Sequence, residues 1–219
     1  IYKKMKVLVF DTETTGIIPK IVKSLDDVPY ILQLSYIFYD LTTSEMISKN
    51  VYIKIDESIV LPIEAQKINN ISRDKLNSHG IPISEALTEF IQYYKACDVI
   101  VAHNIEFDEK MVNYECVRNN ISPVIHKFDP RKGYYCTMKK GINICKIEKE
   151  SKTDAKKKYF KWPKLIELHK HLFQSEPKNL HDALNDNLLC LRCYFAMEKG
   201  YDICHIDDSF KKIYMERVM

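Results

Sequence analysis

Short apolar runs separated by polar turns mark the first part of the chain and predict strands. Met5–Phe10 is rich in β-branched residues and ends at Asp11, which is typical of a buried strand. Ile31–Tyr39 and Met46–Ile55 are two further apolar runs with only a short polar turn between them. Because so short a connection cannot hold a crossover, these two runs are expected to pair as antiparallel strands.

Helical periodicity dominates the rest of the chain. Pro82–Ala96 repeats apolar residues at intervals of three and four, which predicts a helix with one buried face. Val99–Ala102 indicates a short fourth strand, and Asn104 is the expected N-cap of a helix that runs to about Asn119. The remaining predicted elements are one strand and three helices: Tyr134–Met138, Leu165–Phe173, Leu180–Lys199 and Asp207–Arg217. This order of elements predicts an α/β fold in which helices cover a sheet.

One segment departs from this pattern. The stretch from Lys146 to Lys164 holds eight lysines and few apolar residues. Two interpretations are open for it, a solvated or mobile loop and a basic flap over an anionic substrate. No repeat and no linker divides the rest of the chain, so residues 1–219 are expected to form a single domain that carries this lysine-rich loop.

Composition and charge exclude several classes of protein. A net charge of +3 argues against a protein that binds by bulk electrostatics alone. The longest uncharged stretch, Val28–Tyr39, is too short to cross a bilayer, and no secretory leader is recognisable. Seven cysteines at scattered spacings are typical of reduced thiols, so an intracellular location, cytoplasm or nucleus, is expected. The five glycines are too dispersed for a phosphate-binding loop, and GxSxG and HExxH motifs are absent.

Two carboxylates occur where the first strand should be covered. Asp11 and Glu13 are two residues apart, so alternation places them on one face of the strand. That face also carries Val7 and Val9 and is therefore expected to pack against another element. Half-buried carboxylates repel each other and lose hydration unless a cation joins them, and paired oxygens suit Mg²⁺ or Mn²⁺. Taken alone, Asp11 and Glu13 also fit an ordinary structural role, as an acidic pair that precedes the turn at 14–16.

Asp186 interrupts a stripe of small and apolar residues on a predicted helix. The stripe recurs at intervals of three and four and consists of Ala183, Asp186, Cys190, Cys193 and Met197. An ionised carboxylate in such a stripe needs a partner, which is either one basic side chain or a metal shared with Asp11 and Glu13. Cys190 and Cys193 are interpreted as buried thiols, whereas His169 and His171 are predicted to be surface residues.

Asp108 and His181 complete a set of five functional candidates. Each by itself fits an ordinary role, a first-turn acid for Asp108 and a cap or surface residue for His181. Together with Asp11, Glu13 and Asp186, however, they stand in order at the ends of strands or the starts of helices, where open sheets bind ligands. Four acids and a histidine are the inventory of two-metal phosphodiester hydrolysis, with ions about 3.5–4 Å apart.

Three ordered motifs carry a resemblance to a known family. They are DTETTG at 11–16, AHNIEFD at 102–108 and HDALND at 181–186. The chain resembles the DEDDh branch of the DnaQ-like 3′→5′ exonucleases, the family that includes the proofreading epsilon subunit of bacterial DNA polymerase III. The resemblance covers roughly Lys6 to Met197, and the lysine-rich loop looks like an insertion. It implies a ribonuclease H-like fold, a mixed five-stranded sheet flanked by helices with its second strand antiparallel.

The resemblance also implies the metal ligands. Asp11, Glu13 and Asp186 are expected to hold the first of two divalent cations, Mg²⁺ or Mn²⁺. Asp11 would bridge to the second ion, on which Asp108 would act through water. His181 would be the general base.

Substrate and partners follow from the same resemblance. Thr12 is expected to touch the terminal nucleotide and Asn104 to orient the site. The implied reaction releases nucleoside 5′-monophosphates from single-stranded 3′ ends. The motif DTETTG is more similar to that of the DNA-proofreading members of the family than to that of the oligoribonucleases. This favours DNA over RNA as the substrate and makes a polymerase a candidate partner. The alternatives are an exoribonuclease of the same family and a catalytically silent nucleic-acid-binding accessory domain, which the complete set of acids disfavours.

Overall fold

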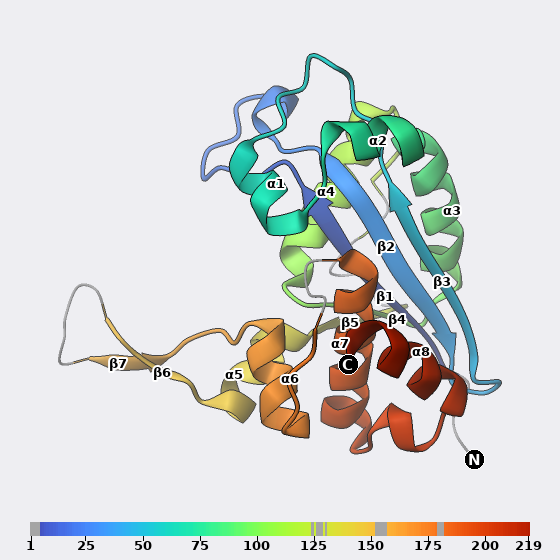
Figure 1. Ribbon diagram of the computed structural model, residues 1–219, viewed down its shortest axis with the longest axis vertical. Coiled ribbons are helices and arrows are strands. Elements are labelled where there is room, and N and C mark those ends of the chain that lie inside the picture. The colour runs from blue at the N-terminus through green and yellow to red at the C-terminus, as the bar shows by residue number, and fades with distance from the viewer. Residues whose placement is uncertain (1–4, 124, 126–128, 130, 152–156, 179–181) are drawn as a thin grey trace.

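A mixed sheet forms the centre of the protein (Figure 1). The computed structural model describes residues 5–123, 125, 129, 131–151, 157–178 and 182–219. The sheet has five strands in the order β3-β2-β1-β4-β5. They are β1 (Lys6–Thr14), β2 (Ile31–Asp40), β3 (Glu45–Tyr52), β4 (Val99–Ala102) and β5 (Gly133–Cys136). Because β2 is antiparallel to β1 and β3 while β1, β4 and β5 are parallel, the predicted fold class is confirmed.

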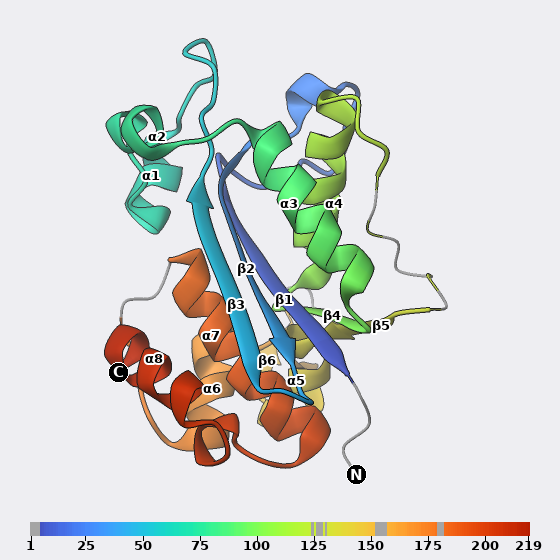
Figure 2. The ribbon, with the colours of Figure 1, turned by 90° about the vertical axis from the view of Figure 1, so that its right-hand side faces the viewer.

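Helices cover both faces of this sheet. Figure 2 shows α3 and α4 on one side and α7 on the other. The α-helices are α1 (Ile63–Asn69), α2 (Arg73–His79), α3 (Ile83–Ala96), α4 (Ile105–Arg118), α5 (Thr137–Cys145), α6 (Leu165–Phe173), α7 (Ala183–Tyr194) and α8 (Asp208–Val218). Short 3₁₀ segments are η1 (Leu25–Asp27) and η3 (Ile203–His205), and the π-helical η2 (Phe195–Lys199) extends α7.

Alternation along β1 divides the hydrophobic core into two halves. Leu8 and Phe10 belong to the core beneath α3 and α4. Val7 and Val9 pack into a second core with α7 and α8. Since Asp11 and Glu13 continue the odd-numbered series, the same alternation carries them onto the face that α7 covers.

The observed elements differ from the predicted ones in their bounds and in three short helices. β1 continues past Phe10 to Thr14 because its pairing with β2 continues. Helices α1 and α2 have only seven residues each, and α5 contains Gly141, so none has the long apolar repeat from which a helix is predicted. The helix predicted from Leu180 begins at Ala183 in the described part of the chain, and Leu180 itself lies outside it.

The prediction of a surface position for His169 is wrong. Its side chain is completely buried on α6, beneath α7 and α8. The Tyr214 hydroxyl lies 2.5 Å from His169 Nε2, and the Ser175 carbonyl lies 3.3 Å from Nδ1. Burial, with the nearby charge of Arg192, lowers the pKa of His169 to about 4, so this histidine is a neutral core residue.

The described part of the lysine-rich segment includes two short strands. It contains β6 (Glu148–Glu150) and β7 (Lys158–Phe160), which pair as an antiparallel hairpin separate from the main sheet. Figure 1 shows this hairpin projecting from α5 and α6 away from the rest of the molecule. A short pairing of this length is hard to predict because lysine-rich sequence has low strand propensity.

The state of the cysteines agrees with the sequence analysis. All seven cysteines are free, and Cys190 and Cys193 are buried in α7 as predicted. Within the described ranges, no helix is both long and apolar enough to cross a membrane.

Candidate active site

Three of the predicted metal ligands lie together where β1 meets the start of α7. Asp11 and Glu13 come from β1 and Asp186 from the first turn of α7. One carboxylate oxygen from each residue lies within 4.8 Å of the other two. All three side chains are partly exposed, so the cluster is open to solvent on one side. The structure thus brings together acids from the first strand and from a helix in the last part of the chain.

Packing of α7 on β1 explains this convergence. The apolar residues of α7, Leu188 among them, join Val7 and Val9 in one buried cluster. That contact brings the beginning of α7 over the next residues of the same β1 face. Asp186 therefore reaches Asp11 and Glu13, and the interruption in its helical stripe faces the carboxylates of the strand.

Asp108 is held beside the last residues of β1, beyond the end of β4. Pairing between β1 and β4 ends at Val9 and Val101, which leaves the next part of β1 without a strand on that side. Asp108 Oδ1 accepts hydrogen bonds there from the Thr12 amide at 3.0 Å and the Thr12 hydroxyl at 2.8 Å. The side chain is buried, and its charge acts on Asp11 and Glu13.

Thr12 and Asn104 are the two residues for which a role toward the substrate is expected, and both have a structural role as well. The Thr12 hydroxyl holds Asp108, and its contact with a terminal nucleotide stays a prediction. Asn104 occupies the N-cap position of α4 as expected, but its side chain makes no capping hydrogen bond. Its backbone is left-handed, with φ of 74°, a conformation that asparagine tolerates better than most residues. His181 lies outside the described residues.

Burial and mutual repulsion raise the pKa values of these acids. Desolvation is the largest cause for Asp11, Glu13 and Asp108, and neighbouring carboxylates add to it for the first two. The pKa of Asp11 lies well above its usual value, and that of Glu13 rises to about 8. The pKa of Asp108 rises only to about 7 because the bonds from Thr12 favour its ionised form. A bound cation would favour the ionised forms of these carboxyl groups and so lower their pKa values.

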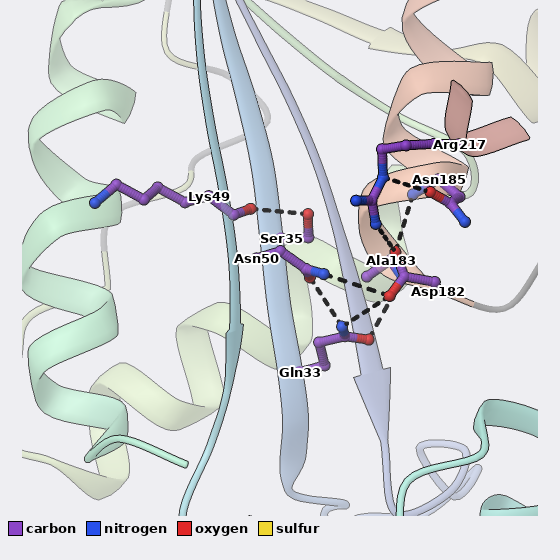
Figure 3. Close-up of polar contacts among 8 residues, drawn as sticks. All are labelled: Gln33, Ser35, Lys49, Asn50, Asp182, Ala183, Asn185 and Arg217. Atoms are coloured by element: carbon purple, nitrogen blue, oxygen red, sulfur yellow. Dashed lines mark hydrogen bonds and ion pairs between the residues drawn. The ribbon is translucent and has the colours of Figure 1, made fainter. Parts of the chain in front are cut away.

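A polar cluster beside the site fixes the start of α7 (Figure 3). The Gln33 side-chain amide donates to Asn50 Oδ1 at 2.8 Å and to Asp182 Oδ2 at 3.4 Å. The Asn50 side-chain amide donates to the same Asp182 oxygen at 3.3 Å. Arg217 of α8 forms an ion pair with Asp182 at 3.5 Å and donates to Asn185 Oδ1 at 3.0 Å. Asp182 in turn caps α7 by accepting from the Asn185 amide.

Sequence reasoning did not identify this cluster. Its members come from β2, β3, α8 and the start of α7, and only Asp182 and Asn185 belong to one of the three motifs. The sequence offered one signal, the polar Gln33 in the middle of an apolar strand. In the structure this side chain is almost fully buried, so it needs hydrogen-bond partners. Because the cluster sets where α7 begins, it also sets where the helix places Asp186.

The donor set fits a hard divalent cation. Carboxylate oxygens from Asp11, Glu13 and Asp186 are the ligands that Mg²⁺ and Mn²⁺ prefer, and the described residues add no thiolate or imidazole to this cluster. Binding of a cation would also relieve the repulsion that raises the pKa values of Asp11 and Glu13. The site is therefore a candidate centre for a hard cation.

Without divalent metal, the protein should lose stability as the pH rises from about 5 to about 8. The pKa of Glu13 is about 8 in the folded protein against an ordinary value of 4.5, so the folded state binds more protons than the unfolded state in this window. Stability therefore falls with rising pH. Mg²⁺ should reverse the trend because it replaces those protons, raising Tm by about 2–4 °C for each kcal/mol of binding.

Thermal unfolding in EDTA and in Mg²⁺ at several pH values measures this effect. The Asp11→Asn variant removes one charge from the cluster with little change of shape, so it should flatten the pH dependence in EDTA. A Tm that stays constant in EDTA across the window would contradict the proposed crowding of ionised carboxylates.

Comparison with protein families identifies the domain. The model of the RNase_T family, described as Exonuclease, matches residues 8–194. The chain belongs to this exonuclease family. The match spans β1 to α7, so it includes all three motifs and every acid of the candidate site. No curated protein matches the chain.

Solved structures of Exonuclease I share the fold of this exonuclease domain. The complex of E. coli Exonuclease I with a dA16 oligonucleotide has a TM-score of 0.61 at 15% identity over 90% of this chain and 42% of that chain. The dT13 complex has a TM-score of 0.65 at 16% identity over 90% and 42%. A product-bound exonuclease I has 0.65 at 13% identity over 90% and 45%. The chain thus spans less than half the length of these proteins.

Proposed function

We propose that this exonuclease domain removes nucleotides from single-stranded 3′ ends in a reaction that depends on two divalent cations, Mg²⁺ or Mn²⁺. The observation that carries the proposal is the set of carboxylate oxygens from Asp11, Glu13 and Asp186 within 4.8 Å of one another. Asp108, buried and hydrogen-bonded to Thr12 of β1, supplies a fourth acid. The products would be nucleoside 5′-monophosphates.

Each acid has a separate role in this proposal. Asp11, Glu13 and Asp186 would bind one cation, and Asp11 and Asp108 would act on a second one, through water in the case of Asp108. Bound cations supply charge stabilisation to the attacking and leaving oxygens of an in-line displacement. His181 would take the proton of the attacking water as a general base, since a histidine can be neutral near physiological pH.

DNA is the proposed polymer and RNA the second candidate. Two similar structures are complexes of E. coli Exonuclease I with dA16 and dT13, which are single-stranded DNA oligonucleotides. The DTETTG motif at 11–16 favours the same choice. A polymerase partner is proposed only from the resemblance to proofreading nucleases, and an intracellular, reducing location is proposed from the free thiols.

A time course with matched 5′-labelled DNA and RNA strands tests the reaction. In Mg²⁺ the DNA should shorten stepwise from its 3′ end, and EDTA should stop the reaction. Moving the label to the 3′ nucleotide should release it in the first step as a 5′-monophosphate, which establishes the direction. Faster loss of RNA would reassign the substrate. If both strands bind and neither shortens, the domain is a binding module instead.

A further inference from the structure

The first turn of α7 carries Asp186 and depends on the residue that caps it. The Asp182 carbonyl accepts from the Asp186 amide at 3.0 Å, which is the first hydrogen bond of the helix. The Asp182 side chain accepts from the Asn185 amide at 3.3 Å and so caps the same turn. The position of Asp182 therefore fixes the backbone from which the Asp186 side chain projects.

Side chains from three other elements hold Asp182. Gln33 of β2 and Asn50 of β3 donate to its Oδ2, and Arg217 of α8 lies 3.5 Å from its Oδ1 (Figure 3). The same guanidinium donates to Asn185 Oδ1 at 3.0 Å. Arg217 thus spans two residues of the start of α7, which suits the planar, fork-shaped set of donors that only arginine offers.

Helix α8 is packed against α7 along its length. Phe210, Tyr214 and Val218 are completely buried and belong to the core that α7 shares with β1. At the end of the helix, the Val218 carbonyl accepts from the Lys178 amide at 2.6 Å. The helix therefore holds the chain on both sides of residues 179–181, at Lys178 before them and at Asp182 after them.

Arg217 lies beyond the part of the chain that the exonuclease family defines. The family match ends at residue 194, and α8 begins at Asp208. Gln33, Asn50 and Asp182 all lie within the matched region. A role for Arg217 in the site would therefore be a property of this chain that membership of the family does not supply.

We propose that Arg217 is a positioning residue of the metal site, because it holds the start of α7 so that Asp186 can bind a divalent cation with the two carboxylates of β1. The proposal rests on the proposed function, since it concerns the same cluster of acids. A guanidinium has no lone pair to offer a metal, so Arg217 acts through Asp182 and Asn185. Without it, fewer molecules would hold all three carboxylates in place, and the apparent affinity for the cation would fall by that fraction.

Charge and position predict opposite effects of removing Arg217. A positive charge near a metal site repels cations, so its loss by charge alone should strengthen the binding of a divalent cation. Loss of a positioning contact should weaken that binding. Because a partly exposed ion pair contributes little to folding, the stability of the protein should hardly change in either case. Weaker cation binding at unchanged stability is therefore a result that neither a purely electrostatic nor a purely structural role can give.

Three variants of α8 test this proposal. Arg217→Ala removes the charge and the fork, Arg217→Lys keeps the charge without the fork, and Lys212→Ala removes a charge from an exposed lysine of the same helix. Binding of Mn²⁺ without substrate is measured from the electron paramagnetic resonance signal of the free ion. The Mg²⁺ concentration that gives half-maximal shortening of single-stranded DNA is measured in parallel, together with Tm in EDTA.

Arg217→Ala should weaken Mn²⁺ binding by about tenfold, the lower end of the loss that follows removal of an outer-shell partner. The half-saturating Mg²⁺ concentration should rise by a similar factor, whereas the rate at saturating Mg²⁺ should approach that of the parent protein, because bound cation selects the competent position. Arg217→Lys should lose less affinity than Arg217→Ala. Lys212→Ala should bind Mn²⁺ at least as tightly as the parent protein, and Tm in EDTA should change little in all three variants.

Unchanged or tighter Mn²⁺ binding by Arg217→Ala would overturn the proposal. An equal loss of affinity in Lys212→Ala would also overturn it, because Lys212 lies outside the polar cluster around Asp182. If the parent protein binds Mn²⁺ but does not shorten DNA, the proposed function fails, yet the Mn²⁺ series still decides the role of Arg217. If the parent protein binds no Mn²⁺, the positioning role fails.

Discussion

Asp186→Ala should abolish Mg²⁺-dependent shortening of single-stranded DNA, with a loss of more than about 10³-fold in rate. Asp186 supplies one of three carboxylates whose oxygens lie within 4.8 Å of one another, and it is the only one that comes from α7. Without it, Asp11 and Glu13 alone would hold the first cation. Each 1.4 kcal/mol of lost transition-state stabilisation costs about tenfold in rate, and a bound metal contributes several kcal/mol.

The matched control is Asp208→Ala. Asp208 is also an acid in the first turn of a helix, α8, but it is exposed and is not one of the clustered acids. Its replacement should leave the rate unchanged. In EDTA, Asp186→Asn should be more stable than the parent protein because one repelling charge has gone. Substantial Mg²⁺-dependent activity in Asp186→Ala would rule out the metal assignment.

His181→Ala should slow hydrolysis by about 10²–10⁴-fold, the usual contribution of a general base. Removal of the base should spare the cation, because the carboxylates of Asp11, Glu13 and Asp186 remain. The Mg²⁺-induced increase in Tm should therefore be retained while the rate falls. The acid limb of the pH–rate profile, where a histidine base becomes protonated, should also flatten.

His171→Ala provides the control for this experiment. His171 is an exposed histidine on α6, so its loss should change neither the rate nor the Mg²⁺-dependent Tm. A His181→Ala protein that loses rate and Mg²⁺-dependent stabilisation together would place His181 among the metal ligands. A His181→Ala protein with the parent rate would require another base.

Much of the candidate site follows from local patterns. Alternation alone places Asp11 and Glu13 on one face of β1, and helical spacing alone puts Asp186 in the stripe that packs toward the sheet. Both patterns depend only on backbone geometry, which residues near in sequence determine. The antiparallel pairing of β2 with β3 likewise follows from the short turn between them, whereas the five-stranded sheet with an antiparallel second strand was implied by the family resemblance.

Contacts between distant segments were not predictable in this way. Thr12 holds Asp108 across 96 positions of the chain, and this bond forms because β4 ends early and leaves the edge of β1 free. His169 is buried because Tyr214 of α8 lies over it, 45 positions away. Neither strand length nor helix docking is encoded in the few residues around Thr12 or His169.

By itself, the sequence indicated the candidate acids Asp11, Glu13 and Asp186, because an acid on a covered strand face or in an apolar helix stripe is costly and therefore informative. The tertiary structure alone decided how these residues are held. Gln33, Asn50 and Arg217 meet at Asp182 only after β2, β3 and α8 have packed around the start of α7. The two faces of the lysine-rich hairpin likewise depend on its register, because shifting one strand by a single residue would exchange its faces.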